Sequence, residues 1–427
     1  MPLRILHIST RLILGGSQEN TVLSCEGQAR LGHEVHLAFG PIYGPEGSLL
    51  ERINAFNTRC ASGEETTRDG GACKPIRTHT VPHLVRQISP LADWRCYGEL
   101  RSLIRERKPD IVHTHSSKAG ILGRAAAWKE KAQPNRDRKG ADPSTTPGAG
   151  IGIIHTIHGP PFHQYQSRLL HRLYVASERF AARRCHLIVS VADAMTRQYL
   201  AENIGRPEQY PTVYSGMETT RFLEAPAAER RATRDPLGIA DSDFVIGTVS
   251  RLAELKGHDD LLDALAADLK KRPDWKLLWV GDGWWRERLY KRIDGLGLRK
   301  QVITTGLVSP ERIPAMIRAM DVLAHPSYRE GLPRTVPQAL LCGICPVAYD
   351  VDGTGEVCRD VDTGRLVNPG DRKGLRDAIV WLAKHPRERA EMAARGRDWC
   401  RERFSAERMV ADLEKVYARA LAAARGG

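Results

Sequence analysis

The strongest constraint on this chain is an alternation of short apolar runs with longer amphipathic stretches, repeated in two blocks. In the first block the apolar runs are β-branched and flanked by Gly, His or Ser, at 4–10, 34–40, 110–115, 151–157 and 186–191. The rhythm restarts in the second block at 244–251, 275–280, 301–304, 321–325 and 345–349. Continuous runs of this kind are typical of strands buried on both faces of a parallel sheet. The pattern therefore predicts an α/β fold with two doubly wound domains.

The length of the chain also argues for more than one domain, because 427 residues exceed what a single hydrophobic core usually organises. Residues 211–220 read as a strand end followed by a Gly turn, which places the boundary there. We expect an N-terminal domain over 1–215, a C-terminal domain over 216–404 and a final amphipathic helix within 405–427. No run of 18 apolar residues occurs, so the sequence predicts no membrane-spanning helix.

The N-terminus and the cysteines favour a cytoplasmic location. The first ten residues lack the basic head and long apolar run of a secretion signal and read as a first strand. Nine cysteines, an odd number, are scattered along the chain, which favours reduced thiols over a disulfide framework. We therefore expect a cytoplasmic protein, and peripheral attachment at the inner face of a membrane stays open.

Positive charge is concentrated in the first half of the chain. The net charge is +13, and before Gly216 there are 28 Lys and Arg against 19 Asp and Glu. Such a half could meet anionic lipid head groups, nucleic acid or an anionic substrate, and solvated helix faces explain the charge equally well. No nucleic-acid-binding motif accompanies the charge, so we expect no nucleic-acid partner and keep an anionic membrane surface as an open one.

Ligands of doubly wound domains bind at the carboxyl ends of the strands, so the residues there are the candidates for a site. Gly15 and Gly16 follow the first strand and open a helix, whose free N–H groups could hold a phosphate or a sugar hydroxyl; a plain tight turn fits equally well. His155 and His158 end another strand and could hydrogen-bond a ligand or carry a proton. A metal site at this pair is disfavoured because no cysteine or carboxylate is near in sequence.

The second block places two cations at a strand end. Arg251 ends one strand and Lys256 follows five residues later, just before a helix. Two fixed cations suit a pyrophosphate, which needs both of its charges neutralised as it leaves. Glycine turns follow the next two strands, at 281–283 and 306–307, and the carboxylate of Glu330 follows another.

The motifs resemble, in content and order, those of family 4 glycosyltransferases. The chain carries GG at 15–16, HG at 158–159, SRLAELKG at 250–257, GDG at 281–283, TGLV at 305–308 and PSYREGLPRTVPQAL at 326–340. The resemblance covers nearly the whole chain, and its most specific parts are the Arg-x4-Lys block and the E-x7-E-like block. It implies the GT-B fold, in which two Rossmann-like domains face a cleft and the C-terminal helix crosses back to the N-terminal domain. It also implies retaining transfer of a sugar from a nucleotide-sugar bound mainly by the C-terminal domain to an acceptor bound mainly by the N-terminal one.

The resemblance implies roles in donor binding for the residues around the opening of the E-x7-E-like block. Glu330 matches the first Glu of that motif and contacts the donor sugar. The backbone of Gly331, Leu332 and Pro333 holds the neighbouring hydroxyls. Gln338 stands where the family has a second Glu that binds the ribose. Because a ribose diol offers neutral hydroxyls, an amide can still bond there, at a cost in affinity of about 1 kcal/mol.

The resemblance assigns the other strand-end residues as well. Arg251 and Lys256 match the pair that holds the diphosphate, and Gly16 matches the loop that approaches the phosphates. His158 matches the active-site histidine near the sugar and the acceptor. The remaining candidates for substrate binding are the turn residues Gly15, Gly281, Gly306 and Leu307.

The expected chemistry needs little beyond these side chains. Negative charge grows on the departing diphosphate, where Arg251 and Lys256 would stabilise it, and Glu330 would stabilise the oxocarbenium-like sugar. In same-face attack the departing phosphate oxygen takes the proton of the acceptor. We therefore expect Glu330 and His158 to be the catalytic residues, no metal ligands, and no cofactor besides the nucleotide-sugar co-substrate. The donor is expected to be a UDP- or GDP-linked hexose, and the acceptor a glycan, a lipid-linked sugar or a small molecule in polysaccharide or glycolipid biosynthesis.

Other functions stay open at this point. The Gln338 replacement would suit a degenerate GT-B protein that binds a nucleotide or lipid without turnover. A related phosphorylase or epimerase would need a pyridoxal-binding lysine or a further carboxylate constellation, and neither is visible.

Three further motifs have a structural explanation. The Asp-x-Asp triplets at 350–352 and 360–362 are disfavoured as metal ligands, because the motif order is not that of the GT-A enzymes that use such triplets. Cys342 and Cys345 are expected to be two small buried residues, since no second pair accompanies them. The pair at 284–285, both Trp, is expected to pack within a helix.

Overall fold

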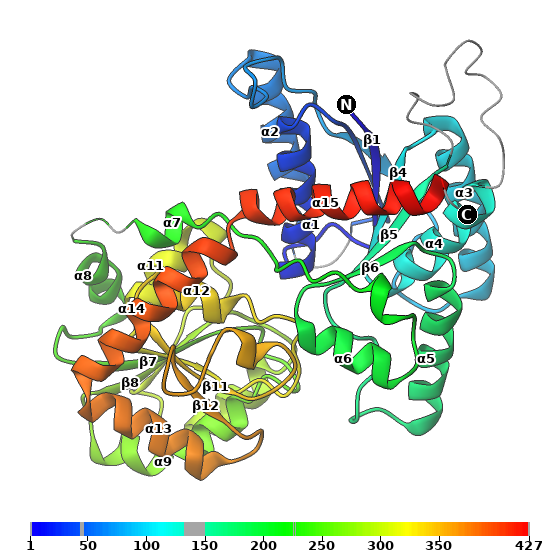
Figure 1. Ribbon diagram of the computed structural model, residues 1–427. Helices are drawn as coiled ribbons and strands as arrows, with labels where there is room; N and C mark the ends of the chain where they lie inside the picture. Colours follow the sequence, from blue (N-terminus) through cyan, green and yellow to red (C-terminus); the bar gives the residue numbers. More distant parts are fainter. Residues whose placement is uncertain (1, 43–46, 132–149, 225, 227, 426–427) are drawn as a thin grey trace. The chain divides into compact units, whose positions relative to one another are not determined.

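The computed structural model describes residues 2–42, 47–131, 150–224, 226 and 228–425, and the chain divides into two compact units. The first unit is formed by Met1–Met217 together with Ala406–Gly427, and the second by Glu218–Ser405. Each unit is an α/β structure with helices around a parallel six-stranded sheet (Figure 1). Among the residues described, no helix combines the length and the apolar composition that a membrane crossing requires.

The sheet of the first unit has the strand order β3-β2-β1-β4-β5-β6. Its strands are β1 (Arg4–Ser9), β2 (Glu34–Phe39), β3 (Arg77–Thr80), β4 (Ile111–His115), β5 (Gly152–Ile157) and β6 (Leu187–Ser190). Five of them agree within one residue at each end with the apolar runs of the sequence. The sequence did not reveal β3, because this edge strand reads RTHT and is mostly exposed, so no buried face marks it.

Helices cover both faces of this first sheet. They are α1 (Gly16–Arg30), α2 (Leu50–Ser62), α3 (Pro90–Arg107), α4 (Ser117–Lys131), α5 (Arg168–Ala182), α6 (Asp193–Ala201) and the C-terminal α15 (Ala406–Arg425). Leu413 and Tyr417 of α15 share one hydrophobic core with Ile5 and Ile154 of the sheet. The C-terminal helix, red in Figure 1, is therefore an integral layer of the first unit.

The second unit repeats the architecture with the strand order β12-β11-β10-β7-β8-β9. Its strands are β7 (Phe244–Val249), β8 (Trp275–Val280), β9 (Val302–Thr304), β10 (Val322–His325), β11 (Cys345–Tyr349) and β12 (Arg365–Val367). Its helices are α7 (Thr220–Leu223), α8 (Glu229–Arg234), α9 (His258–Lys271), α10 (Arg286–Gly295), α11 (Ile313–Arg318), α12 (Thr335–Leu341), α13 (Arg372–Lys384) and α14 (Pro386–Arg403). The α/β class with two doubly wound parallel sheets is thus confirmed.

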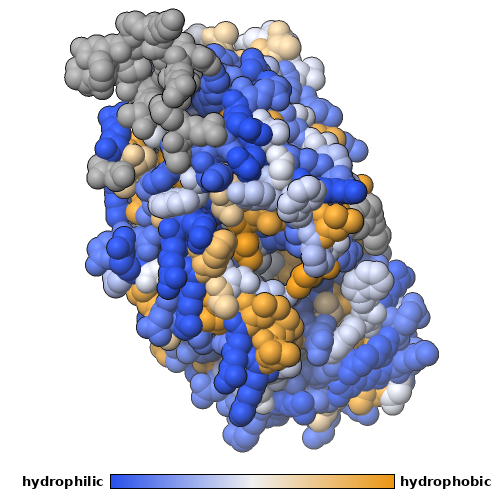
Figure 2. All heavy atoms as spheres, turned by 90° about the vertical axis from the view of Figure 1, so that its right-hand side faces the viewer, coloured by the Kyte–Doolittle hydropathy of each residue, from blue (hydrophilic) through white to orange (hydrophobic). Residues whose placement is uncertain are grey.

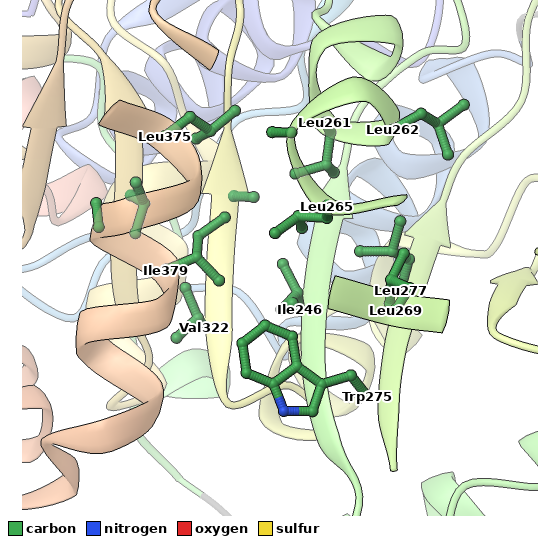
Figure 3. Close-up of a cluster of buried hydrophobic side chains, with 14 of the residues drawn as sticks. Ile246, Leu261, Leu262, Leu265, Leu269, Trp275, Leu277, Val322, Leu375 and Ile379 are labelled. Atoms are coloured by element: carbon green, nitrogen blue, oxygen red, sulfur yellow. The ribbon is translucent and has the colours of Figure 1, made fainter. Parts of the chain in front are cut away.

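The core of the second unit lies between its sheet and the helices α9 and α13. Leu261 and Leu265 from α9 and Ile379 from α13 point toward Ile246 and Val322 of the central strands (Figure 3). All five side chains are fully buried. Burial of such side chains contributes about 1.5–3 kcal/mol each, and it holds the ends of β7 and β10 in a fixed relation.

Candidate active site

The carboxyl ends of β7 and β10 bring together an ionic cluster in the second unit. Lys256, in the loop after β7, places its Nζ 2.7 Å from Oε1 of Glu330, in the loop after β10. His325, the last residue of β10, places its Nε2 3.1 Å from the same oxygen. The Glu330 side chain is only 14% exposed, so its charge is held by these two partners and little by water.

The protonation state of Glu330 follows from this environment. Burial by itself would raise the pKa of the carboxyl group, but the Lys256 ammonium and the His325 hydrogen bond outweigh it. Together they hold the pKa of Glu330 well below its ordinary value. Glu330 is therefore a carboxylate at neutral pH, as an electrostatic stabiliser must be.

The loop that carries Lys256 is docked by its backbone on the loop that carries Glu330. The carbonyl of Leu255 accepts hydrogen bonds from Tyr328 N at 2.8 Å and from Ser327 Oγ at 3.2 Å. Gly257 has φ +72°, and a Cβ there would lie 1.9 Å from the carbonyl oxygen of Pro326. Only glycine allows the backbone at position 257 to come this close to the Pro326 carbonyl with a positive φ. The contact therefore requires a glycine between Lys256 and the first residue of α9.

Asp352 holds the Glu330 loop from the other side. The backbone N–H of Glu330 donates to Asp352 Oδ2 at 2.6 Å, and Gly353 N donates to the carbonyl of Gly331 at 3.0 Å. Leu332 is buried beneath this turn. The first Asp-x-Asp triplet therefore positions the proposed sugar-binding loop. Neither this role nor that of His325 was predicted from the sequence, although the position of His325 at a strand end was a usable signal.

The residue that replaces the second motif Glu lies on α12. Gln338 is buried, with 7% of its surface exposed, and its backbone N donates to the carbonyl of Arg334 in the first turn. Pro337 precedes it in the same turn, where the missing N–H costs no helical hydrogen bond. The helix begins at Thr335, directly after the turn that includes Pro333.

The two glycine turns of the second unit meet each other. Gly281 N donates to the carbonyl of Gly306 at 3.0 Å, and a Cβ at Gly281 would lie 2.1 Å from the carbonyl oxygen of Ser250. These turns therefore lie beside the start of the Arg251–Lys256 loop. Arg251 is exposed, and Leu307 exposes 64% of its surface.

The first unit contains a cavity of about 250 Å³ at the carboxyl ends of its central strands. It is lined by Ser17, Ser116, Ser117, His155, Thr156, Ile157, His158, Gly159 and Tyr199. His158 is half-buried there, and its Nε2 lies 3.2 Å from Nδ1 of His115. Gly15 and Gly16 precede Ser17 and are both exposed at the start of α1. Gly15 has φ −177°, an extended conformation that any residue adopts.

The three motifs set aside earlier have structural explanations, with two corrections. Asp360 Oδ1 accepts from the backbone of Leu366 at 3.0 Å and belongs to a hollow of about 570 Å³ that shares no residue with the Lys256–Glu330 cluster. Cys345 is buried as expected, whereas Cys342 is half-buried; their thiols bond to different backbone carbonyls, and burial raises the pKa of each to about 12. The expectation for the Trp pair was wrong for Trp284, which precedes α10 and is 90% exposed.

Two family models match the chain, one on each half. The model for "Glycosyl transferase 4-like domain" matches residues 15–216, and the model for "Glycosyl transferases group 1" matches residues 229–399. The structure of Anabaena HepE in complex with UDP and glucose superimposes with a TM-score of 0.75 at 20% identity, over 97% of this chain and 99% of that one. The fold is therefore the GT-B fold.

Curated relatives carry the comparison further. The chain is 27% identical over 310 residues to the UDP-Gal:alpha-D-GlcNAc-diphosphoundecaprenol alpha-1,3-galactosyltransferase of Escherichia coli, covering 71% of this chain and 74% of the relative. It is 31% identical over 219 residues to the GDP-mannose-dependent alpha-(1-6)-phosphatidylinositol monomannoside mannosyltransferase of Mycolicibacterium smegmatis, covering 50% and 57% respectively. The chain is an enzyme that transfers sugars. It belongs to the family 4-like glycosyltransferases.

Proposed function

We propose that this glycosyltransferase is a retaining enzyme that moves a hexose from a UDP- or GDP-linked donor to a glycan, lipid-linked or small-molecule acceptor, with no metal ion. The observation that carries the proposal is the buried cluster of Lys256, Glu330 and His325 at adjacent strand ends. It combines a carboxylate kept ionised with a cation beside it. Transfer of a glycosyl group needs both, because positive charge grows on the sugar while negative charge grows on the leaving diphosphate.

The leaving group would be handled by Lys256 and Arg251. Lys256 is 19% exposed and already fixed beside Glu330, so little ordering remains when a diphosphate arrives. Arg251 is exposed five residues earlier and can pair with a phosphate through two parallel hydrogen bonds. These two cations supply the charge neutralisation that a divalent ion provides elsewhere, which is the reason to propose metal independence.

The identity of the donor is supported by the relatives. Among those reported above, one is named for UDP-galactose, another for GDP-mannose, and the HepE structure holds UDP and glucose. We therefore place UDP- and GDP-linked hexoses first. Gln338 is proposed to contact the ribose and the turn of Gly331, Leu332 and Pro333 to contact the sugar, whereas the acceptor is proposed to bind near His158.

A binding screen followed by product analysis tests this function. Thermal unfolding is measured with UDP, GDP, ADP and their sugars, and the stabilising donor is then incubated with candidate acceptors. We expect a donor-specific rise in melting temperature, an α-linked product from an α-linked donor by proton NMR, and full activity after EDTA treatment. An inverted anomer or activity restored only by a divalent ion would contradict the mechanism.

A degenerate protein that binds nucleotide without turnover is the second candidate, and the Gln338 replacement favours it. Its signature would be a melting shift with UDP or GDP and no sugar release, either to acceptors or to water, across the whole donor panel. The charged cluster around Glu330 argues against it, since an ionised buried carboxylate is costly to keep without a function.

We also propose that the first unit binds an anionic membrane surface through α5. Leu169, Leu173 and Phe180 on its outer face are 81%, 53% and 45% exposed. Arg168, Arg172 and Arg179 are exposed on the same helix, and Arg183 is exposed directly after its end. On the side of the molecule shown in Figure 2, hydrophobic side chains lie at the surface among hydrophilic ones. Exposed Leu and Phe between arginines are typical of a helix lying at a lipid interface.

The charge of α5 favours lipid over a second copy of the chain. Its one carboxylate, Glu178, is buried and paired with Arg124 at 2.8 Å, so the outer face carries only positive charge. Two such faces would repel each other in a symmetric dimer. An anionic bilayer would attract the arginines through its head groups and bury the exposed apolar side chains in its interface. It would also bring a lipid-linked acceptor to the enzyme.

Vesicle flotation tests this surface. We expect the wild type to float with vesicles of mixed phosphatidylglycerol and phosphatidylcholine at low salt, and not with phosphatidylcholine alone. The double variant Leu169→Ser/Leu173→Ser should lose most of this binding, whereas Trp284→Ser, which removes an even more exposed side chain from the second unit, should keep it. Equal binding by both variants, or a concentration-dependent dimer without lipid, would refute the proposal.

A further inference from the structure

A line of buried histidines crosses the core of the first unit and ends at His158. His7 on β1 lies opposite His113 on β4 in the strand register. His115 follows two residues later, so both β4 histidines project from the same face of the sheet. All three are fully or almost fully buried. The side chains of Gln28 on α1 and Tyr417 on α15 cover them.

The side chains form two hydrogen-bonded arms that start at the amide of Gln28. In the first arm Gln28 Oε1 lies 2.7 Å from His7 Nε2, His7 Nδ1 lies 3.0 Å from His115 Nε2, and His115 Nδ1 lies 3.2 Å from His158 Nε2. In the second arm Gln28 Nε2 donates to Tyr417 OH at 2.8 Å, Tyr417 OH lies 2.8 Å from His113 Nδ1, and His113 Nε2 lies 2.7 Å from Thr156 Oγ1. Both arms end at residues that line the 250 Å³ cavity.

The three buried histidines are close enough to suggest a metal site, since one nitrogen from each lies within 4.8 Å of the others. Each of their six ring nitrogens, however, already has a hydrogen-bond partner in the two arms. Burial also lowers the pKa of His7 to about 4 and lowers the pKa of His113 and His115 well below the ordinary value. The cluster is therefore a network of neutral imidazoles, each with one N–H.

Neutral imidazoles make the network directional. A neutral ring donates from one nitrogen and accepts at the other, so the protonation of one ring dictates that of the next. Gln28 Oε1 can only accept, so His7 carries its proton on Nε2. His115 must then donate from Nε2 to His7, and His158 must donate from Nε2 to His115. In the second arm Tyr417 donates to His113 Nδ1, and His113 donates from Nε2 to Thr156.

Only one other arrangement satisfies every contact and also uses the Tyr417 hydroxyl hydrogen within the two arms. If the Gln28 amide turns over, each donor becomes an acceptor along both arms, and all four imidazoles carry their proton on Nδ1 instead. A mixed arrangement would either place two lone pairs or two N–H groups against each other, or leave the Tyr417 hydroxyl hydrogen without an acceptor in the two arms, and each unsatisfied buried group costs about 1–3 kcal/mol. The four histidines therefore share one tautomer in either state.

We propose that Gln28, His7 and His115 are positioning residues that hold His158 in the Nε2–H tautomer and so present its Nδ1 as a hydrogen-bond acceptor at the acceptor site. In this orientation of the Gln28 amide, Thr156 Oγ1 accepts the hydrogen bond from His113 Nε2. The hydroxyl hydrogen of Thr156 can then be donated to another group. This inference rests on the proposed role of His158 at the acceptor site. A hydroxyl of the acceptor substrate is the group that such a nitrogen would orient.

Nitrogen-15 NMR of the histidine rings in the wild-type protein tests the inference without any activity measurement. The two tautomers differ clearly in their ring-nitrogen shifts, and each signal is assigned by its loss in a His→Gln variant. We expect His7, His113, His115 and His158 all to be Nε2–H at neutral pH. A mixed set, or a uniform Nδ1–H set, would overturn the proposal.

A matched pair of variants then tests the link to His158. In His7→Phe the first arm loses its acceptor, so His115 can donate from Nδ1 to His158 and turn His158 to the Nδ1–H form. His36→Phe removes an equally buried histidine of the same sheet, bonded to His79 at 2.8 Å and absent from both arms, and should leave His158 unchanged. An unchanged His158 tautomer in His7→Phe would refute the link.

Steady-state kinetics of the same two variants separate this inference from the proposed function. We expect His7→Phe to lower kcat about tenfold with little change in the KM of the donor, whereas His36→Phe retains kcat. A shift of the His158 tautomer with kcat unchanged would support the network and count instead against a role of His158 in transfer. Equal losses of kcat in the two variants would show a general packing effect and overturn the positioning role.

Discussion

Replacing Lys256 should show how strongly the stability of the fold around Glu330 depends on the Lys256 ammonium group. In Lys256→Met the apolar stem is replaced with little loss of volume, but the carboxylate loses the ammonium at 2.7 Å and, among the residues described, keeps the His325 contact at 3.1 Å. Breaking a buried ion pair by removal of one partner costs about 3–5 kcal/mol. The side chains of Glu330 and Lys256 are 14% and 19% exposed and His325 remains, so we expect a loss of stability below this range, about 2 kcal/mol.

Urea unfolding followed by tryptophan fluorescence is the appropriate assay, because six of the eight tryptophans lie in the second unit. Glu330→Gln and the double variant Lys256→Met/Glu330→Gln complete a double-mutant cycle. The double variant should recover most of the stability lost in Lys256→Met, since it leaves no buried charge without a partner. It should still be inactive, which separates catalysis from folding.

The pH dependence of the same cycle has a definite sign. In the wild type the pKa of Glu330 is held below its ordinary value. The ionised Glu330 therefore contributes its full stabilisation of the folded state above about pH 4.3, and this contribution is lost as pH falls through the pKa of Glu330 in the folded state. In Lys256→Met burial acts against His325 alone, so that pKa rises. The destabilisation should therefore be largest at neutral pH and shrink on acidification. A cost below about 0.5 kcal/mol, or one independent of pH, would refute the reasoning.

Four further substitutions test the rest of the site. Lys256→Ala and Glu330→Ala should each lower the rate of transfer at least about tenfold, and near-wild-type rates in both would mean that the site is misplaced. Gln338→Glu should retain transfer in a kinetic assay, because either side chain accepts a ribose hydroxyl; an inactive variant would rule out the ribose assignment. Gly257→Ala should cost about 2 kcal/mol in urea unfolding, since its Cβ would overlap the carbonyl of Pro326; an unchanged midpoint would contradict that contact.

Much of the architecture could be predicted because buried strands leave short, local patterns of apolar residues in the sequence. Strands buried on both faces, such as β1 and β8, carry continuous apolar runs that a reader of the sequence can find. Edge strands such as β3 carry no such run, and so they were missed. The strand-end rule also located Lys256 and Glu330, although their separation by 74 positions hid the 2.7 Å contact between them.

The amino-acid sequence by itself determined where each strand ends and which chemistry stands there, because hydrophobic periodicity and glycine turns act over a few residues. Only the tertiary structure decided which strand ends meet, since strand order depends on packing between distant segments. That order sets His7 against His115, 108 positions away, and brings Tyr417 of α15 to His113. It also places Asp352, part of an Asp-x-Asp triplet that resembles a metal-binding motif, where its carboxylate accepts from the backbone N–H of Glu330 and anchors the Glu330 loop. Lys256 and Glu330 could thus be found in the sequence as single strand-end residues, whereas their contact with His325 and the histidine network of the first unit are apparent only in the folded structure.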